Sequence, residues 1–363
     1  MSADLFLTGA TGFIGRSLLQ KWLDSTDTHI HLLVRGRREE SPAERMEQVL
    51  IQTYPDRQIG ALRSRFDIVE GDISLDQFGL NDENYRRLSE RVSHIIHCAA
   101  AARFDLELDQ ARSINVRGTE NILALAQECI RPPKIDYIGT AYVAGQRKGV
   151  IKEDELDEGQ EHNNTYERSK LEAEKLVRDN MADLPITIFR PSIVIGDSKT
   201  GRVSGFSAFY RVLKMYLLGR LNKLPGDPSC PLDLVPVDYT TDVTHIISGD
   251  GQSRGRCYHL TAGLDNATTL EEIQDLTSHY FGREKFAIIA PEEFLTYISR
   301  VKDSLSEEEQ AGIDELRIYL PYLTGQLRFD NSNTLDALSL TGLEVPRVSD
   351  YFGKMAEYMR QQM

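Results

Sequence analysis

A glycine-rich octapeptide close to the start of the chain restricts its fold more than any other feature. TGATGFIG occupies residues 8–15, between the apolar run Leu5-Phe6-Leu7 and a helix-like apolar pattern that begins at Ser17. Such a turn needs one glycine for an unusual backbone angle, a second where the main chain approaches a pyrophosphate, and a third where helix and strand pack closely. The phosphates then lie on free N–H groups of the helix. The octapeptide therefore predicts a strand, a tight turn and a helix that bind a dinucleotide.

Runs rich in β-forming residues alternate with helical patterns through the first half of the chain. The patterns at Tyr85–Val92 and Val116–Cys129 predict two of the intervening helices. The expected strands cover residues 4–8, 30–34, 66–70, 94–97, 135–139 and 186–190. This alternation indicates a parallel sheet with helices on both faces. We therefore predict an α/β fold, a Rossmann-type doubly wound parallel sheet with a smaller, mostly helical C-terminal substrate-binding cap.

The pattern changes after Arg190-Pro191, where glycine, proline and aromatic residues become frequent. Strand-like runs return at 234–237 and 258–260, and the C-terminal part of the chain is typical of helices plus one strand at 326–329. We predict a dinucleotide-binding Rossmann domain from 1–196 plus about 235–260, and a cap from 197–234 plus 261–363. Because doubly wound folds bind ligands at the carboxyl ends of their strands, the active-site cleft is expected between sheet and cap.

Composition and charge exclude several classes of protein. The formal net charge of −14 argues against a general nucleic-acid binder, which needs a basic surface. The four cysteines contain no CxxC pair, and His94 and His97 bracket a strand without a third ligand, so neither a disulfide framework nor a metal site is expected. No leader is recognisable, and no apolar run reaches the roughly 20 residues that span a bilayer. We expect a cytoplasmic protein without a membrane span and leave peripheral membrane contact open.

The residues after the second expected strand favour NADPH over NADH. NAD-binding proteins usually place Asp or Glu about 20 residues after the glycines, where it binds the ribose hydroxyls. This chain instead has Leu33-Val34-Arg35-Gly36-Arg37-Arg38. Arg35 can hold a 2′-phosphate through paired hydrogen bonds, and Arg16, next to Gly15, can add a second contact. The alternative interpretation is a solvated basic loop.

A tyrosine and a lysine four residues apart are the candidate catalytic pair. Tyr166 and Lys170 fall on one face of a helix expected to run to Asp179. A nearby cation lowers the pKa of a phenol from about 10, which suits the phenol to proton transfer. Thr140 follows an expected strand and can bind the same reacting oxygen, and Asn115 lies in the preceding helix. Without this context the pair is typical of an ordinary helix surface.

These motifs, together with Gly71-Asp72-Ile73, His97–Ala100 and Arg190-Pro191-Ser192, resemble the extended short-chain dehydrogenase/reductase superfamily over about residues 1–260. The resemblance implies that Asp72 contacts adenine, that Ala99 and Ala100 line the cofactor path, and that residues 191–194 flank the nicotinamide. It places Tyr166, Lys170, Thr140 and Asn115 as the catalytic residues. The expected cofactor-binding residues are Thr8, Gly9, Thr11, Gly12, Phe13, Ile14, Gly15, Arg16, Arg35, Asp72, Ile73, Ala99, Ala100, Ala101, Tyr166, Lys170, Pro191, Ser192 and Val194.

Three further stretches are similar to the thioester reductase and fatty acyl-CoA reductase branch of that superfamily. They lie at 32–35, 139–143 and 234–238, and the tail from Leu320 to Asn331 is a less specific match. The resemblance implies an NADPH-dependent reductase that converts an acyl-CoA or carrier-bound acyl group to an aldehyde, with further reduction to the alcohol left open. The alternatives are a ketone or aldehyde reductase, a nucleotide-sugar epimerase or dehydratase of the same superfamily, or an NADPH-binding sensor or scaffold. Acyl chain, carrier, oligomeric state and reaction direction stay open.

A basic stretch from Ser198 to Gly226 contains no Asp or Glu in an otherwise acidic chain. Its cations are Lys199, Arg202, Arg211, Lys214, Arg220 and Lys223, and an apolar stripe at helical spacing contains Phe206, Phe209, Tyr210, Leu213 and Leu217. One hypothesis places the acyl chain on this stripe and the phosphates of coenzyme A or of a carrier's phosphopantetheine on the cations. A cap helix packed into the core and a membrane-facing helix are the alternatives.

Overall fold

A seven-stranded parallel sheet forms the centre of the larger half of the molecule, as the sequence predicts. The computed structural model describes residues 4–55, 59–203, 208–219, 222–301 and 317–362. The strand order is β12-β7-β5-β4-β1-β2-β3, and every pairing in this sheet is parallel. The strands are β1 Asp4–Thr8, β2 Ile30–Val34, β3 Phe66–Glu70, β4 Val92–His97, β5 Lys134–Ile138, β7 Ile186–Pro191 and β12 Cys257–Leu260. The expected doubly wound fold is confirmed.

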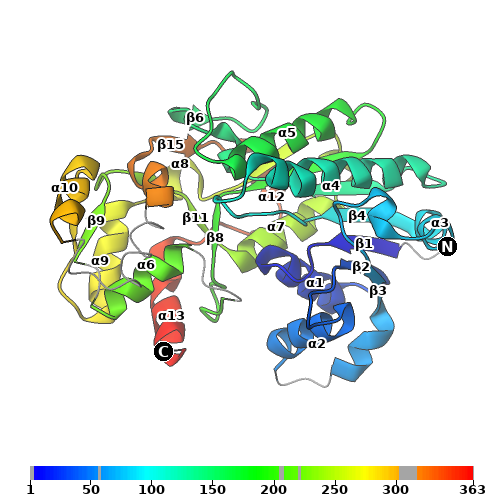
Figure 1. Ribbon diagram of the computed structural model, residues 1–363, viewed down its shortest axis with the longest axis horizontal. Helices are drawn as coiled ribbons and strands as arrows, with labels where there is room; N and C mark the ends of the chain where they lie inside the picture. Colours follow the sequence, from blue (N-terminus) through cyan, green and yellow to red (C-terminus); the bar gives the residue numbers. More distant parts are fainter. Residues whose placement is uncertain (1–3, 56–58, 204–207, 220–221, 302–316, 363) are drawn as a thin grey trace.

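Helices cover both faces of the sheet (Figure 1), and successive strand side chains pack alternately against one helical layer and the other. Leu5 and Leu7 of β1 pack on one face, whereas Phe6 between them packs on the other, because successive side chains of a strand point to opposite faces. One layer contains α1 Phe13–Ser25, α2 Pro42–Thr53 and α7 Val237–Gly249. The opposite layer contains α3 Asp82–Arg91, α4 Leu108–Glu128 and α5 Thr165–Asp179.

The glycine turn has the close approaches that its sequence predicts. Gly9 has a φ of +78°, and a Cβ built on it would lie 2.7 Å from the nitrogen of Ala99. A Cβ on Gly15 would lie 2.1 Å from the oxygen of Gly9. Helix α1 follows this turn with Gly12 as its N-cap. Only glycine fits where the turn meets the loop after β4 and where α1 packs on the turn.

The cap lies beside the sheet half of the molecule (Figure 1). It is built around a separate apolar cluster. It includes α6 Ala208–Leu217, β9 Lys223–Pro225, α9 Leu270–Phe281, β14 Ala287–Ile289, α10 Pro291–Val301, α13 Val348–Gln361 and the helical segment 317–324. The small pairings are β8 Ile193–Ile195 with β11 Leu234–Pro236, β9 with β14, and β10 Pro231–Leu232 with β13 Thr268–Thr269. The short helix α8 Gly263–Asn266 follows β12.

The C-terminal part of the chain differs from expectation in its number of strands and in where its tail packs. It contains β13 and β14 in addition to the expected strand, β15 Leu327–Phe329. β15 pairs with β6 Gly149–Ile151, and α12 Ser332–Leu338 lies against β12 and α7. This tail therefore returns to the sheet half of the molecule. None of the described helices is both long enough and apolar enough to cross a bilayer.

Candidate active site

Helix α5 carries the two central residues of the site. The side chain of its N-cap, Asn164, accepts a hydrogen bond from the Glu167 nitrogen at 3.0 Å, which starts the helix at Thr165. Tyr166 and Lys170 then lie one turn apart. The Lys170 ammonium donates to the Ile138 carbonyl at 3.0 Å, at the carboxyl end of β5. Tyr166 shares a side-chain hydrogen bond with Thr140, which follows Ile138 by two residues. The structure thus brings the expected tyrosine, lysine and threonine together.

Burial dominates the proton affinities of this pair. It raises the pKa of Tyr166 to about 12, against the opposing effect of the Thr140 hydrogen bond. It lowers the pKa of Lys170 to about 8. The expectation that the lysine depresses the phenol pKa is therefore wrong for this structure, because desolvation of the phenolate is the largest effect on that pKa and raises it. A phenol with this pKa is protonated at neutral pH and can donate its proton.

Asn115 lies between the loop that follows β4 and helix α5, which carries the catalytic pair. It is buried in α4, where its side-chain oxygen accepts from the Ala101 nitrogen at 2.8 Å and its nitrogen donates to the Ser169 hydroxyl at 2.8 Å. These bonds join the loop after β4 to α5 beside Lys170. The predicted relay role of Asn115 stays a prediction, since its described hydrogen bonds hold backbone and helix rather than Tyr166 or Thr140.

The glycine turn faces the loop that follows β4. The Thr8 hydroxyl accepts from the nitrogens of Cys98 and Ala99 at 3.2 and 3.1 Å, and lies 2.9 Å from His97 Nδ1. This places the expected turn residues, 8–16, against the expected wall formed by residues 99–101. Thr11 also accepts a hydrogen bond from Arg45, at 3.1 Å. Arg45 was not expected from sequence, because no motif links α2 to the turn.

The expected adenosine contacts lie at the carboxyl ends of β2 and β3. The Arg35 guanidinium donates to the Asp72 carboxylate at 3.0 Å, and the Arg35 side chain is 61% exposed. Burial raises the pKa of Asp72, but hydrogen bonds from Ser74 and from Arg35 lower it below its ordinary value. Arg16 donates to Gln52 at 2.6 Å, while Ile73 is buried beside Gly118 of α4. Arg35 and Asp72 are therefore neighbours, and Arg16 points toward α2.

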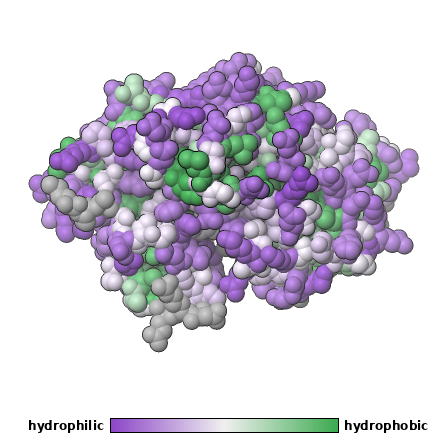
Figure 2. All heavy atoms as spheres, turned by 180° about the vertical axis from the view of Figure 1, so that it is seen from behind, coloured by the Kyte–Doolittle hydropathy of each residue, from purple (hydrophilic) through white to green (hydrophobic). Residues whose placement is uncertain are grey.

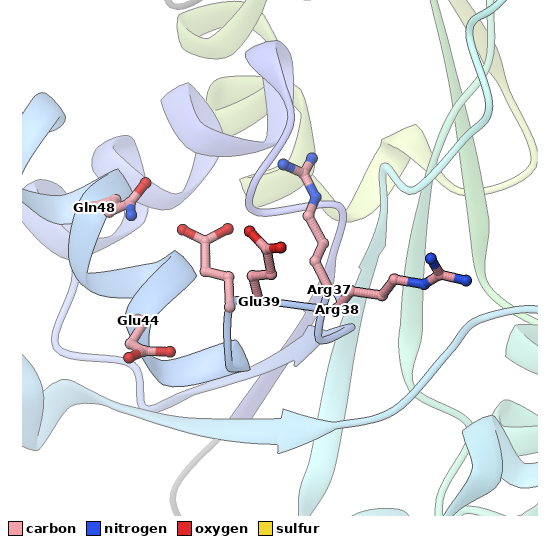
Figure 3. A pocket seen from close by; sticks show the side chains of 6 residues that line it. Arg37, Arg38, Glu39, Glu44 and Gln48 are labelled. Carbon is pink, nitrogen blue, oxygen red and sulfur yellow. The ribbon is translucent and has the colours of Figure 1, made fainter.

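An open pocket adjoins this end of β2. It has a volume of about 550 Å³ and is lined by Arg37, Arg38, Glu39, Glu40, Glu44 and Gln48. In Figure 3 one of the two labelled arginine side chains extends away from Glu39, Glu44 and Gln48, whereas the other runs alongside Glu39. The pocket at the end of β2 therefore has both basic and acidic side chains in its lining.

A second cavity connects Thr140 and Tyr166 to the cap. It has a volume of about 390 Å³. Thr140 and Tyr166 lie on its wall beside Ser192 and Val194, which with Pro191 at the end of β7 were expected to flank the nicotinamide. Its other walls are mainly apolar and come from α6, α9, the small cap strands and segment 317–324. The face drawn in Figure 2 is mostly hydrophilic with a few apolar patches. A concave, mainly apolar lining with a few polar groups is typical of a ligand site.

Segment 317–324 also fixes the surroundings of Tyr166. Tyr322 donates a short hydrogen bond to the fully buried Glu167 and accepts one from Asn164 at 2.7 Å. The ring of Phe104 stacks between Tyr322 and Tyr166, with centroid separations of 5.6 and 5.7 Å. Burial raises the pKa of Glu167. This network was missed from sequence, because its members are brought together by the fold.

Some residues of the basic stretch 198–226 lie in the core of the cap, and others line the cavity or are exposed. Tyr210 is buried in the cap, whereas Phe209 and Leu213 of the apolar stripe line the cavity. Arg211 lies on the cavity rim and Lys214 is exposed on the same helix. Phe206 and Arg220 lie outside the described residues. The helix ends as expected, since Gly219, just beyond it, has a φ of +74°.

Comparisons with known proteins show which family the chain resembles. A family model described as male sterility protein matches residues 7–244. Fatty acyl-CoA reductase 1 of Arabidopsis thaliana is 26% identical over 346 residues, which cover 77% of this chain and 70% of that protein. The chain spans between 26% and 70% of the length of the first curated relatives that it matches. The activities of those longer proteins are therefore assigned to this chain only as proposals.

Solved structures give a second comparison. The crystal structure of the terminal R domain from the myxalamid PKS-NRPS biosynthetic pathway is 30% identical, with a TM-score of 0.85 over 99% of this chain and 91% of that chain. UDP-glucuronic acid 4-epimerase from Bacillus cereus, in complex with NAD, is 19% identical, with a TM-score of 0.70 over 99% of this chain and 97% of that chain. The second likeness shows the fold alone.

Proposed function

The chain belongs to the male sterility protein family, and on that premise we propose that it reduces the acyl group of a thioester with NADPH. Family membership confirms the resemblance to the fatty acyl-CoA and thioester reductase branch, and with it the oxidoreductase class and a nicotinamide cofactor. The thioester, the choice of NADPH and the product are our proposals.

The observation that carries the proposal is the cavity that begins at Thr140 and Tyr166 and continues into an apolar cap. A sugar nucleotide would present many hydroxyls, and burying them without partners costs free energy. An acyl chain presents none and gains from leaving water. We propose that the cap supplies this apolar wall through α6, α9, its small strands and segment 317–324.

The residues present fit a dinucleotide. Gly9 and Gly15 occupy positions where a Cβ would collide with backbone, and the N–H groups of α1 begin directly after its N-cap, Gly12. We propose that this turn holds the pyrophosphate, that Lys170 holds the nicotinamide ribose, and that Arg35 with Arg16 holds the 2′-phosphate. When bound, NADPH supplies a hydride to the carbonyl carbon.

The protein's own groups complete the reduction. Tyr166 donates its proton to the carbonyl oxygen as negative charge develops there, and Thr140 stabilises that oxygen with a hydrogen bond. In the resulting hemithioacetal the C–S bond then breaks and the hydroxyl proton passes to the departing sulfur, which releases the thiol and leaves an aldehyde. We propose the aldehyde as the first product and coenzyme A or a carrier's phosphopantetheine as the thiol.

A substrate screen tests the proposal. Oxidation of NADPH is followed with a long-chain acyl-CoA, the matching aldehyde, a methyl ketone of equal length and a UDP-sugar, and each assay is repeated with NADH. We expect turnover with the acyl-CoA, and faster turnover with NADPH than with NADH. Turnover confined to the ketone, or none with any thioester, would show that the proposed substrate class is wrong.

A further inference from the structure

Two histidines and an aspartate meet at the edge of the sheet opposite the active site. His29 Nε2 lies 2.9 Å from Asp67 Oδ2, and His31 Nδ1 lies 3.8 Å from the same oxygen. One ligand atom from each residue lies within 4.8 Å of the other two. The proposed reduction uses none of these residues.

The strand register explains why these side chains converge. His31 of β2 pairs directly with Asp67 of β3, and on its other side pairs with Phe6 of β1. His29 precedes His31 by two residues, and Asp4 precedes Phe6 by two. Side chains two residues apart on a strand share a face, so His29, His31, Asp67 and Asp4 all meet on one side of the sheet at its amino end.

A carboxylate behind His31 orients its ring. His31 Nε2 lies 3.1 Å from Asp4 Oδ2, and both side chains are almost fully buried. If Nε2 carries the ring proton and donates it to Asp4, the lone pair of Nδ1 points toward Asp67. Metal-binding histidines commonly donate their second nitrogen to a carboxylate in this way. Arg91 also donates to Asp4, at 3.0 Å, which holds the carboxylate in place.

We propose that His29, His31 and Asp67 form a binding site for a divalent transition-metal ion, with Zn²⁺ as its representative. Two imidazoles and one carboxylate suit zinc, whereas Mg²⁺ and Ca²⁺ prefer sites made of oxygen. Ligands about 2.0–2.2 Å from a tetrahedral zinc lie roughly 3.4 Å from one another, so small side-chain movements convert the present arrangement into a coordinated one. The metal replaces the proton between His29 and Asp67.

The position of this site indicates a structural role. It joins the loop before β2 to β3, whereas the glycine turn and Arg35 lie at the opposite ends of β1 and β2. The Asp67 side chain is 57% exposed and that of His29 is 26% exposed, so an ion can enter from solvent. The bound ion stabilises the edge of the sheet without contacting substrate. This proposal differs from the expectation drawn from the sequence, which was that the chain has no metal site.

Calorimetry on the full-length, tag-free protein, first treated with chelator and then dialysed, tests the site. Zn²⁺ is titrated into the wild type, His29→Ala, Asp67→Asn and a control, His279→Ala, which removes an exposed histidine of α9. We expect one saturable zinc per chain for wild type and control, binding at least about tenfold weaker in the two site variants, and no binding of Mg²⁺. Zinc should also raise the melting temperature of the wild type and control only.

Circular dichroism checks that each variant is folded. If His29→Ala does not fold, Asp67→Asn decides the outcome, because the Asp67 side chain is largely exposed and its replacement should not disturb the fold. The proposal is overturned if the wild type binds no zinc at a single saturable site. It is equally overturned if a folded site variant binds zinc as tightly as the wild type, or if the control loses binding to the same extent.

Discussion

The two walls of the active-site cavity are made in different ways. The wall on the sheet side comes from short contiguous motifs at the carboxyl ends of β5 and β7 and from the first turn of α5, and it supplies Thr140 and Tyr166, with Lys170 buried behind it. The wall on the cap side comes from α6, α9, small strands and segment 317–324, which lie far apart in sequence, and it is mainly apolar.

This difference separates chemistry from selectivity. On the sheet wall a single hydroxyl or ammonium group has a role that no neighbour can replace, because proton transfer needs one group at one position. On the cap wall many side chains share the work of excluding water, and each contributes in proportion to the area it buries. Changes on the sheet wall should therefore alter the rate strongly, and changes on the cap wall should mainly alter substrate preference.

The largest effect is expected from Tyr166→Phe, which removes the proton donor and keeps the ring. The kcat should fall by roughly 10²- to 10⁴-fold, with little change in cofactor affinity. Steady-state kinetics and fluorescence titration of NADPH measure the two quantities. Tyr142→Phe, which removes another hydroxyl from the same cavity, is the matched control and should stay near wild type. A Tyr166→Phe enzyme with wild-type kcat would refute the assigned proton donor.

Arg35→Ala should change cofactor preference on the sheet side. A hydrogen bond to a charged group contributes about 1.5–3 kcal/mol, so we expect roughly tenfold or greater weakening of NADPH binding and little effect on NADH. The Kd values for both cofactors provide the test. Arg86→Ala, an exposed arginine on α3, controls for loss of charge. Equal weakening of both cofactors would mean that Arg35 acts through its ion pair with Asp72 rather than through the 2′-phosphate.

Tyr322→Phe tests whether the two walls are independent. The variant keeps the ring on Phe104 but removes the hydrogen bonds to Glu167 and Asn164. We expect kcat to fall about fivefold, equivalent to about 1 kcal/mol, with KM for NADPH unchanged. Glu167→Gln combined with Tyr322→Phe should be less damaging than the sum of the two single changes, since both affect the same contact. A raised KM with unchanged kcat would instead place Tyr322 in substrate binding.

The smallest effect is expected from Arg211→Ala combined with Lys214→Ala on the rim of the cap. Contacts between exposed charges contribute about 0.2–1 kcal/mol, so KM for the acyl-CoA should rise only a few fold, and more at low salt. KM for the matching aldehyde, which lacks phosphates, should not change. Lys285→Ala, another exposed cap lysine, is the control. Equal effects on both substrates would exclude this rim as the site of the phosphates.

The sheet side could be predicted from sequence because its signals are local. The bounds of β1, β2 and β3 match the expected strands, and α5 ends at Asp179 as expected. By contrast, Tyr322 contacts Glu167 across 155 positions, and no periodicity of either segment indicates that contact. The phenol pKa was predicted in the wrong direction because sequence gives the neighbours of Tyr166 but not its burial. His29 and His31 do leave a signal, an alternating pair at the start of a strand, but Asp67 becomes their neighbour only through the register of β2 and β3.

Release of a thiol tests the central claim most directly, because no ketone reductase or epimerase breaks a C–S bond. Purified enzyme is mixed with a long-chain acyl-CoA and NADPH, and free thiol and NADPH are measured in the same sample over time. We predict that thiol appears only when NADPH is present, with one NADPH consumed per thiol if the reaction stops at the aldehyde and two if it continues to the alcohol. Tyr166→Phe should abolish both signals together. NADPH consumption without thiol release, or thiol release that does not need NADPH, would contradict the account.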